Sequence, residues 1–221
     1  GLLGSSATVL FRNLGYDVVA TNSSELDITD ISKLEEYINN NQPDVIINCA
    51  AFTNVDACET EEGWIRAEAL NAKAPVDLAR ICLEKNITCI HVSTDYVFGA
   101  SDLVGYTESD NPDPINAYGK SKFQAEQGIV ELCGGIEDSN FKNQDSKIFI
   151  IRISWLFGQG ATNFVQKIIT KANQEGELKI VQDEIGCPTY TEDIVKAMKF
   201  LLEEKMLPGI YHVASNNSCS R

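Results

Sequence analysis

The chain has little basic charge and no long apolar run. Its 221 residues carry 18 Lys and Arg against 32 Asp and Glu, a formal net charge of -14. Because nucleic acid and anionic membranes repel such a protein, we expect neither as a partner. No apolar stretch approaches the roughly 20 residues that span a bilayer, and no basic and apolar leader is seen. We therefore expect a soluble, cytoplasmic protein.

Patterns of metal ligands are also scarce. Both histidines, His91 and His212, lie in strand-like runs, and we interpret them as structural. The seven cysteines are scattered without a CxxC spacing and are odd in number, which indicates neither a disulfide framework nor a zinc site. Cys49 and Cys89 lie in apolar patterns, where a reduced thiol serves as a small hydrophobe. We predict no metal.

Helical and strand-like segments alternate along the chain. The expected helices cover 2–14, 30–40, 61–85 with a kink near Pro75, 117–132, 162–175 and 191–205. The expected strands cover 17–21, 44–51, 87–93, 148–153, 178–181 and 209–214. The run at 44–51 is apolar throughout, as in a buried strand of a parallel sheet. The alternation predicts an α/β fold with a doubly wound parallel sheet, and the polar segment 134–147 is expected to be a surface loop.

The most informative feature lies at 91–122. In the run HVSTDYVFG, Thr94 directly follows the predicted strand 87–93, and NAYGKSK places Tyr118 and Lys122 four positions apart, on one face of a helix. A cation about 4 Å from a tyrosine favours the phenolate by about 4 kcal/mol at an effective dielectric of about 20, roughly three pKa units. We therefore expect the pKa of Tyr118 near neutrality and an acid/base role for the pair.

The start of the chain suggests a dinucleotide site. The segment GLLG at 1–4, before the first expected helix, looks like the second half of a GxxGxxG turn, whose glycines let the backbone approach a pyrophosphate. We expect the first strand of the sheet to be missing from this chain. Residues 20–24 hold neither an acidic residue for a ribose hydroxyl nor an arginine for a 2′-phosphate, so NADH and NADPH both stay open.

Ten segments, in order, resemble the extended short-chain dehydrogenase/reductases, and among them the dTDP-4-dehydrorhamnose reductases. They include LDITD at 26–30, PDVIINCAAFTNVDACE at 43–59, HVSTDYVFG at 91–99, DPINAYGKSKFQAE at 113–126, IRISWLFG at 151–158 and IGCPTY at 185–190. The resemblance implies NAD(P)H-dependent reduction of the C4 ketone of dTDP-4-dehydro-L-rhamnose. It implies an NAD(P)-binding Rossmann domain at 1–150 and a substrate-binding portion at 151–221, interleaved with the last strands and truncated at its C-terminus. The resemblance is also compatible with a homodimer.

The resemblance implies roles for individual residues. Tyr118 matches the general acid, Lys122 lowers its pKa and holds the nicotinamide ribose, and Thr94 donates a hydrogen bond to the substrate oxygen. The residues expected against the sugar are Val55, Thr94, Asp95, Tyr96 and Trp155. The further residues expected along the cofactor are Gly1, Leu2 and Leu3 at the pyrophosphate, Asp27 and Ile28 at the adenine, Ala51, Phe52 and Thr53 beside the ribose and phosphates, and Val92 near the nicotinamide. Asn71 is another candidate, or it holds the kink of its helix.

Two alternatives stay open. One is another nucleotide-sugar enzyme, an epimerase or dehydratase, because the same fold and Tyr/Lys pair serve several chemistries. Trp155 within ISWLFG, together with STDYVF, favours the reductase. The other is a non-catalytic relative that binds NADP, resembling the regulatory β subunit of methionine adenosyltransferase. Oxidation of NAD(P)H by a dehydro-sugar nucleotide would discriminate between them.

Overall fold

The structure is a computed structural model that describes residues 1–99, 105–160, 163–180 and 182–220. The chain folds into two units. The first, here called the sheet unit, comprises residues 21–152 and 206–212. The second, the helix unit, comprises residues 1–20, 153–205 and 213–221. The N-terminal helix therefore belongs to the helix unit, together with residues 153–205.

The sheet unit is built on a sheet with the strand order β1-β2-β5-β9-β4-β3. Its main strands are β1 (Val45–Asn48), β2 (Thr88–Thr94), β5 (Ile148–Ile153) and β9 (Gly209–Val213). Strands β1 and β2 pair in parallel, with Asn48 opposite His91. The connections from β1 to β2 and from β2 to β5 both pass through helices. The predicted α/β class is confirmed, and the two apolar runs at 44–51 and 87–93 form the neighbouring strands β1 and β2.

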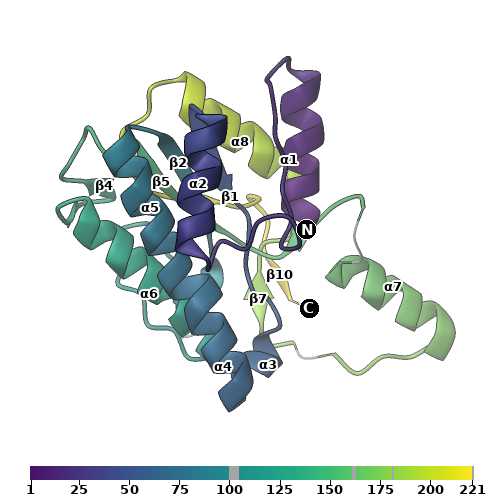
Figure 1. Ribbon diagram of the computed structural model, residues 1–221. Coiled ribbons are helices and arrows are strands. Elements are labelled where there is room, and N and C mark those ends of the chain that lie inside the picture. Colours follow the sequence, from purple (N-terminus) through teal and green to yellow (C-terminus); the bar gives the residue numbers. More distant parts are fainter. Residues whose placement is uncertain (100–104, 161–162, 181, 221) are drawn as a thin grey trace. The chain divides into compact units, whose positions relative to one another are not determined.

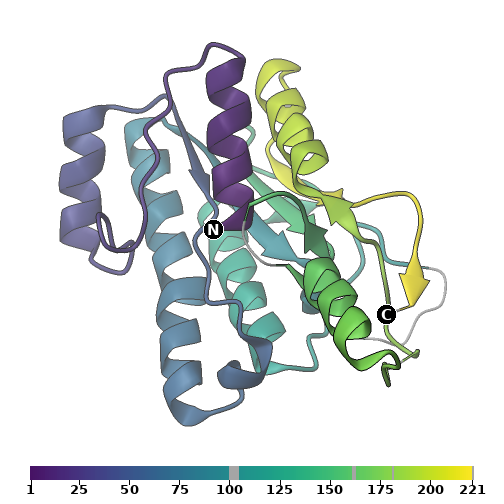
Figure 2. The same cartoon turned by 90° about the vertical axis from the view of Figure 1, so that its right-hand side faces the viewer.

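Helices of the sheet unit are α2 (Ile31–Asn41), α3 (Val55–Cys58), α4 (Glu61–Ala67), α5 (Ala74–Lys85) and α6 (Ala117–Leu132). Figures 1 and 2 show α5 and α6 side by side. The predicted kink near Pro75 is confirmed, because the chain between α4 and α5 is a π-helix, η1 (Glu68–Lys73). A proline ring clashes with the carbonyl four residues earlier in a regular α-helix, and the wider turn relieves that clash.

The apolar core of the sheet unit lies among α2, α5, α6 and the strands. It is formed by aliphatic side chains and reduced cysteines, including Leu34, Ile38, Leu78, Ile81, Cys82, Cys89, Ile129, Cys133, Phe141, Ile148 and Ile150. Cys89 is thus a small hydrophobe, as predicted. Burial of such side chains stabilises the fold by about 25 cal/mol for each Å² of apolar surface removed from water.

The helix unit contains α1 (Leu2–Asn13), α7 (Phe164–Glu175) and α8 (Thr191–Glu203). Helices α1 and α8 lie side by side in both ribbon views (Figures 1 and 2). The Ser6 hydroxyl donates to Thr191 Oγ1 at 2.9 Å. Two short ladders complete the unit: β6 (Leu156–Phe157) is parallel to β8 (Thr189–Tyr190), and β7 (Ile185–Gly186) is antiparallel to β10 (Cys219–Ser220).

The prediction of a surface loop at 134–147 is wrong. This segment forms a hairpin of β3 (Ile136–Glu137) and β4 (Asn140–Phe141), and β4 pairs antiparallel with β9. Phe141 is fully buried, and its amide donates to the carbonyl of Pro208 at 2.9 Å. A Cβ on Gly209 would lie 2.4 Å from the carbonyl oxygen of Ser139, so only glycine permits this close approach. The prediction failed because the segment is polar overall, although it contains one aromatic side chain, Phe141, that is buried.

Two expected strands do not form. Residues 17–21 are not a strand, and the carbonyl of Val18 accepts from the Arg12 guanidinium. Residues 178–180 are not a strand and are largely exposed, while residues 181 and 162 lie outside the described residues. Strand β1 stands at one edge of the sheet and Val45 is 37% exposed, so it is less buried than its apolar sequence predicts.

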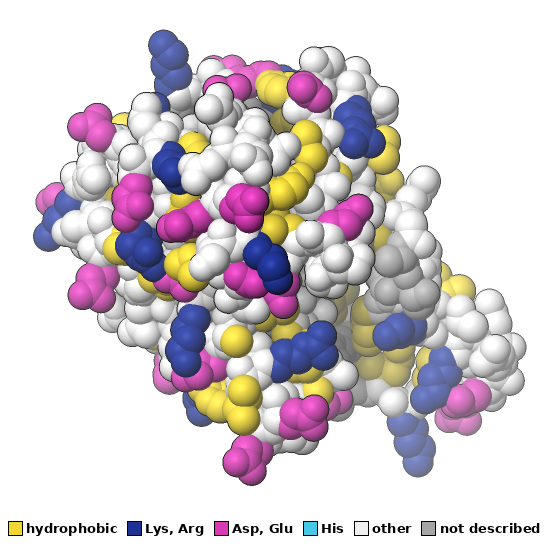
Figure 3. Space-filling model, viewed as in Figure 1, with side chains coloured by type: hydrophobic (Ala, Val, Ile, Leu, Met, Phe, Trp, Pro, Cys, Tyr) yellow, Lys and Arg dark blue, Asp and Glu magenta, His cyan; other side chains and the backbone are white. Residues whose placement is uncertain are grey.

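Surface charge is mixed on the face drawn in Figure 3. Lys and Arg side chains there are interspersed with Asp and Glu over α2 and α5. Within the described part of the chain, no helix is both long and apolar enough to cross a membrane.

The hairpin generates a stability prediction. Phe141→Ala should lower the free energy of unfolding by about 3–5 kcal/mol, because it leaves a cavity beneath β4. Lys142→Ala, at the exposed neighbouring position, should change it by less than about 0.5 kcal/mol. Urea unfolding of both variants measures the difference. Equal, small effects would mean that 134–147 is a loop after all.

Candidate active site

The candidate site is built where β2 ends. Thr94 is the last residue of β2, and its hydroxyl donates to the Asp95 carboxylate at 3.1 Å. The amide of Tyr96 donates to Thr94 Oγ1 at 3.3 Å, which starts the short 3₁₀ helix η2 (Asp95–Val97). Thr94 is 6% exposed. A hydroxyl and a carboxylate therefore lie at the carboxyl end of a parallel strand, where α/β sheets present their ligands.

Helix α6 brings Tyr118 to the same place. Asn116 caps the helix, and its Oδ1 accepts from the amide of Gly119 at 2.7 Å. A Cβ on Gly119 would lie 2.1 Å from the carbonyl oxygen of Tyr96, so glycine lets α6 press against η2. The rings of Tyr96 and Tyr118 meet edge to face, with 5.7 Å between their centroids.

The pKa of Tyr118 is shifted in the direction opposite to the prediction. Burial raises it well above the ordinary value, a hydrogen bond with Thr94 opposes that shift, and the Asp95 carboxylate adds to it. The expected lowering toward neutrality is wrong because desolvation of the phenolate dominates. The phenol is therefore held firmly in its protonated form.

Lys122 is buried one helical turn beyond Tyr118, and its amine faces β2. Its Nζ donates to the carbonyl of Val92 at 2.7 Å and lies 3.2 Å from His91 Nε2. The side chain is 1% exposed. Burial lowers the pKa of Lys122 to about 8, although Glu126 and Cys49 act in the other direction. The structure thus brings together Thr94, Asp95, Tyr96, Tyr118, Lys122 and Val92.

The sequence predicts a structural role for His91, and the structure places its ring against Lys122. Its Nδ1 lies 3.3 Å from Nδ2 of Asn48 on the neighbouring strand. Burial and the Lys122 charge hold the pKa of His91 well below its ordinary value, so the ring is neutral. One signal could have revealed this contact. Positions 91 and 93 share a strand face, and positions 122 and 126 share a helix face.

An unpredicted ion pair anchors α6. Arg152 on β5 donates to Glu126 on α6 through Nε and Nη2, with the shortest contact at 2.7 Å. The Ser93 hydroxyl donates to Glu126 Oε1 at 2.5 Å. Arg152 and Glu126 are 3% and 1% exposed. These bonds fix α6 across β2 and β5.

The loop after β1 carries several predicted cofactor residues. The amide of Phe52 donates to Asn71 Oδ1 at 2.8 Å, and Asn71 Nδ2 donates to the Phe52 carbonyl at 2.9 Å and to Ser121 Oγ at 3.1 Å. Asn71 therefore ties the loop to α6 from within the π-helix. Ala51 is half-buried, Thr53 is exposed, and Val55 begins α3. Their contacts with a ligand stay predictions.

The predicted adenine residues lie before α2. The Asp27 carboxylate accepts from the amide of Thr29 at 3.0 Å and from its hydroxyl at 2.8 Å, and these bonds lower the pKa of Asp27. Ile28 packs against the apolar core. Asp27 thus shapes its own turn, and a role at an adenine stays a prediction.

The remaining predicted residues belong to the helix unit. Gly1 precedes α1, Leu2 begins it, and Leu3 is buried within the unit. Trp155 has a φ of 36°, in the left-handed region, and its carbonyl accepts from the amide of Thr189 at 3.1 Å. A Cβ on Gly186 would lie 2.2 Å from the indole. A non-glycine residue held in this region costs of order 1–3 kcal/mol and is typical of functional positions.

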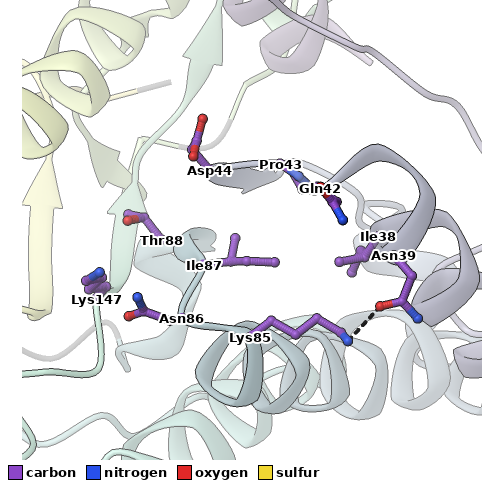
Figure 4. Close-up of a pocket in the computed structure, with 10 residues that line it drawn as sticks. All are labelled: Ile38, Asn39, Gln42, Pro43, Asp44, Lys85, Asn86, Ile87, Thr88 and Lys147. Carbon is purple, nitrogen blue, oxygen red and sulfur yellow. Dashed lines mark hydrogen bonds between the residues drawn. The ribbon is translucent and has the colours of Figure 1, made fainter.

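A hollow of about 660 Å³ lies at the opposite ends of β1 and β2. Figure 4 shows Asp44 and Thr88 near the strand starts, Lys147, and Lys85 reaching toward Asn39. The Lys85 amine donates to Asn39 Oδ1 at 2.7 Å. The nearby ends of α2 and α5 are C-termini, which repel anions. The hollow is therefore a poorer candidate than the site at Thr94 for binding an anionic ligand.

A mainly parallel α/β sheet, with a threonine at the end of β2 and a tyrosine and a buried lysine on the neighbouring helix α6, is typical of the short-chain dehydrogenase/reductase class. The family model described as RmlD substrate binding domain matches residues 1–221. The chain belongs to this family.

Individual relatives agree with this assignment. The chain is 36% identical to the spore coat polysaccharide biosynthesis protein SpsK of Bacillus subtilis, covering 100% of this chain and 72% of that protein. It is 36% identical to a dTDP-4-dehydrorhamnose reductase of Mycolicibacterium smegmatis, covering 94% of this chain and 59% of the relative. A crystal structure of dTDP-4-dehydrorhamnose reductase from Bacillus anthracis in complex with NADP is 35% identical with a TM-score of 0.88, covering 100% of this chain and 73% of that one.

The neutral state of buried His91 generates a prediction about pH. Below pH about 6.5 the unfolded chain protonates this histidine and the folded protein does not, so stability falls as pH falls. The wild type should therefore lose up to about 1.4 kcal/mol per pH unit more than His91→Gln in this range. Urea unfolding at several pH values measures this loss, and His212 cancels because both proteins contain it. Parallel curves would contradict the prediction.

Proposed function

We propose that this protein reduces the C4 ketone of dTDP-4-dehydro-L-rhamnose, using NADPH or NADH, to give dTDP-L-rhamnose. The observation that carries this proposal is the convergence of Thr94, Tyr118 and Lys122 at the end of β2. The names of the relatives supply the substrate. We further propose that residues 1–150 serve mainly the cofactor and 151–221 mainly the sugar. A homodimer and a cytoplasmic location stay predictions, for sedimentation and cell fractionation to test.

The residues at the end of β2 fit a nicotinamide cofactor. A protonated lysine has three N–H groups, and Lys122 directs one at Val92 and another at His91, which leaves one donor for a ribose hydroxyl. The half-buried side chain of Val92 offers apolar surface on β2, and the half-buried Ala51 lies in the loop after β1. When bound, NAD(P)H supplies the hydride.

Tyr118 and Thr94 would complete the reduction. Hydride addition to the C4 carbon leaves negative charge on the carbonyl oxygen, which needs a proton to become the alcohol. The Tyr118 phenol gives that proton, and its raised pKa keeps the proton in place until the charge appears. The Thr94 hydroxyl would turn from the Asp95 carboxylate and donate its hydrogen bond to the same oxygen, and the Lys122 ammonium stabilises the resulting phenolate.

Several further side chains are proposed to contact the sugar. Tyr96, held edge to face against Tyr118, and Asp95 supply an aromatic surface and an acceptor for hydroxyls. Val55 begins α3 in the loop after β1. Trp155, with its left-handed backbone, supports a binding role, because such a conformation in an aromatic residue is rarely kept for packing alone.

The mechanism generates a prediction about turnover. Tyr118→Phe removes the proton donor with little change of shape, so kcat should fall by about 10²- to 10⁴-fold while cofactor affinity stays nearly unchanged. Thr94→Val should lower kcat by about 10²-fold, as the loss of one donor to a developing oxyanion. Single-turnover oxidation of NADPH by the dehydro-sugar nucleotide measures both. A Tyr118→Phe enzyme with wild-type turnover would refute the assigned chemistry.

Cofactor binding generates a second prediction. NADPH or NADH at about 100 times its dissociation constant should stabilise the intact protein by about 2.7 kcal/mol, since only the folded state binds it. Lys122→Met should weaken this effect, because the ribose loses a donor. Thermal unfolding with and without millimolar cofactor measures it. Absence of stabilisation by both cofactors would contradict the proposal.

A further inference from the structure

A chain of buried polar groups leads from the loop after β1 to the amine of Lys122. The amide of Ala50 donates to Asn48 Oδ1 at 3.1 Å. Asn48 Nδ2 lies 3.3 Å from His91 Nδ1, and His91 Nε2 lies 3.2 Å from Lys122 Nζ. Asn48, His91 and Lys122 are 5%, 1% and 1% exposed. Because these side chains are buried from water, each donor must face a protein acceptor or lose its hydrogen bond.

The direction of these bonds follows from the backbone. A peptide N–H can only donate, so the carbonyl of the Asn48 amide faces Ala50 and its NH₂ group faces the ring of His91. Nδ1 must then accept, and the neutral imidazole carries its proton on Nε2. That N–H points at Lys122 Nζ. It finds an acceptor only when the amine is neutral and offers its lone pair.

A protonated Lys122 requires a different arrangement. The ammonium donates to Nε2, so the imidazole must carry its proton on Nδ1, which then faces the NH₂ group of Asn48. This contact between two donors is relieved only if the Asn48 amide turns over and gives up its bond from Ala50. Each proton taken up by the lysine therefore costs one good hydrogen bond in the chain.

We propose that His91, held by Asn48, is a positioning residue that fixes the amine of Lys122 and sets how readily it takes up a proton. This inference rests on the proposed function, in which the ammonium form of Lys122 assists the reduction. The lysine would be charged during turnover at neutral pH and would lose its charge, and its use to the reaction, in mildly alkaline solution.

Other ionisable groups near the lysine do not replace this control. The Glu126 carboxylate, one turn further along α6, is engaged by Arg152 and Ser93. Burial raises the pKa of Cys49, in the loop after β1, to about 11, so it is a neutral thiol.

The groups near Tyr118 act on the phenol. Tyr118 itself is neutral, and Asp95 from η2 and Cys58 from α3 raise its pKa. Among the described groups around Nζ, His91 is thus the one that can exchange its donor and acceptor roles.

The first test is the pH dependence of kcat/KM for reduction. Its alkaline limb should report Lys122, whose pKa of about 8 lies below that of Tyr118. His91→Gln offers an amide oxygen to the ammonium, so the limb should move to higher pH by about one unit. His91→Leu offers no polar partner, so the limb should move to lower pH by a similar amount.

His212→Gln is the matched control. This second histidine is on β9, where its Nε2 lies 3.3 Å from Arg152 Nη1, and its replacement should leave the midpoint of the limb unchanged. A purely structural His91 would give two variants with altered stability and an unmoved limb. That result, or shifts of both variants in the same direction, would overturn the inference. A wild-type protein without reductase activity would instead refute the proposed function.

The second test does not measure enzyme activity, and it does not require a His91 variant that folds. Nitrogen-15 NMR distinguishes the two imidazole tautomers, and the chain has only two histidines, so the signals are simple to assign. Between pH about 7 and 10 the proton of His91 should move from Nδ1 to Nε2 as Lys122 titrates. In Lys122→Met the transition should vanish. A His91 tautomer that stays constant over this range in the wild type would overturn the inference.

Discussion

The sheet unit depends on the burial of three charged side chains between α6 and the sheet. Lys122, Glu126 and Arg152 are each at most 3% exposed. Charges removed from water are tolerated only when partners surround them, and loss of one partner from a buried pair costs about 3–5 kcal/mol. Arg152 meets Glu126, and Lys122 meets the Val92 carbonyl and His91. The position of α6 against β2 and β5 follows from these bonds, and with it the position of Tyr118.

The same constraint shapes the chemistry of the site. Burial lowers the pKa of Lys122 and raises that of Tyr118, so both groups are poised by desolvation and not by a direct pair. For a reductase this arrangement is suitable, because the tyrosine must hold its proton until the alkoxide forms. The lysine stays charged at neutral pH but close to its titration point, and small changes in its surroundings therefore matter.

Small residues and irregular turns bring these groups close together. Gly119 lets α6 approach the carbonyl of Tyr96, and the π-helix before Pro75 turns Asn71 toward the loop after β1. The kink was predictable, because a proline inside a helical pattern distorts it. The contacts of Asn71 were not predictable, because they join it to Phe52 and Ser121, which lie 19 and 50 positions away in the sequence.

The α/β class, most helices and the Tyr118–Lys122 pair follow from the amino-acid sequence, because hydrophobic periodicity and a four-residue spacing are local properties. Which apolar or polar runs pair as strands depends on tertiary contacts. Residues 17–21 form no strand, whereas the segment around the buried Phe141 joins the sheet beside β9. The tertiary structure also decides the direction of the pKa shift at Tyr118 and the contact of His91 with Lys122. The pKa shift and the contact both depend on burial and on side chains from distant segments. The spacing of a motif contains no information about either.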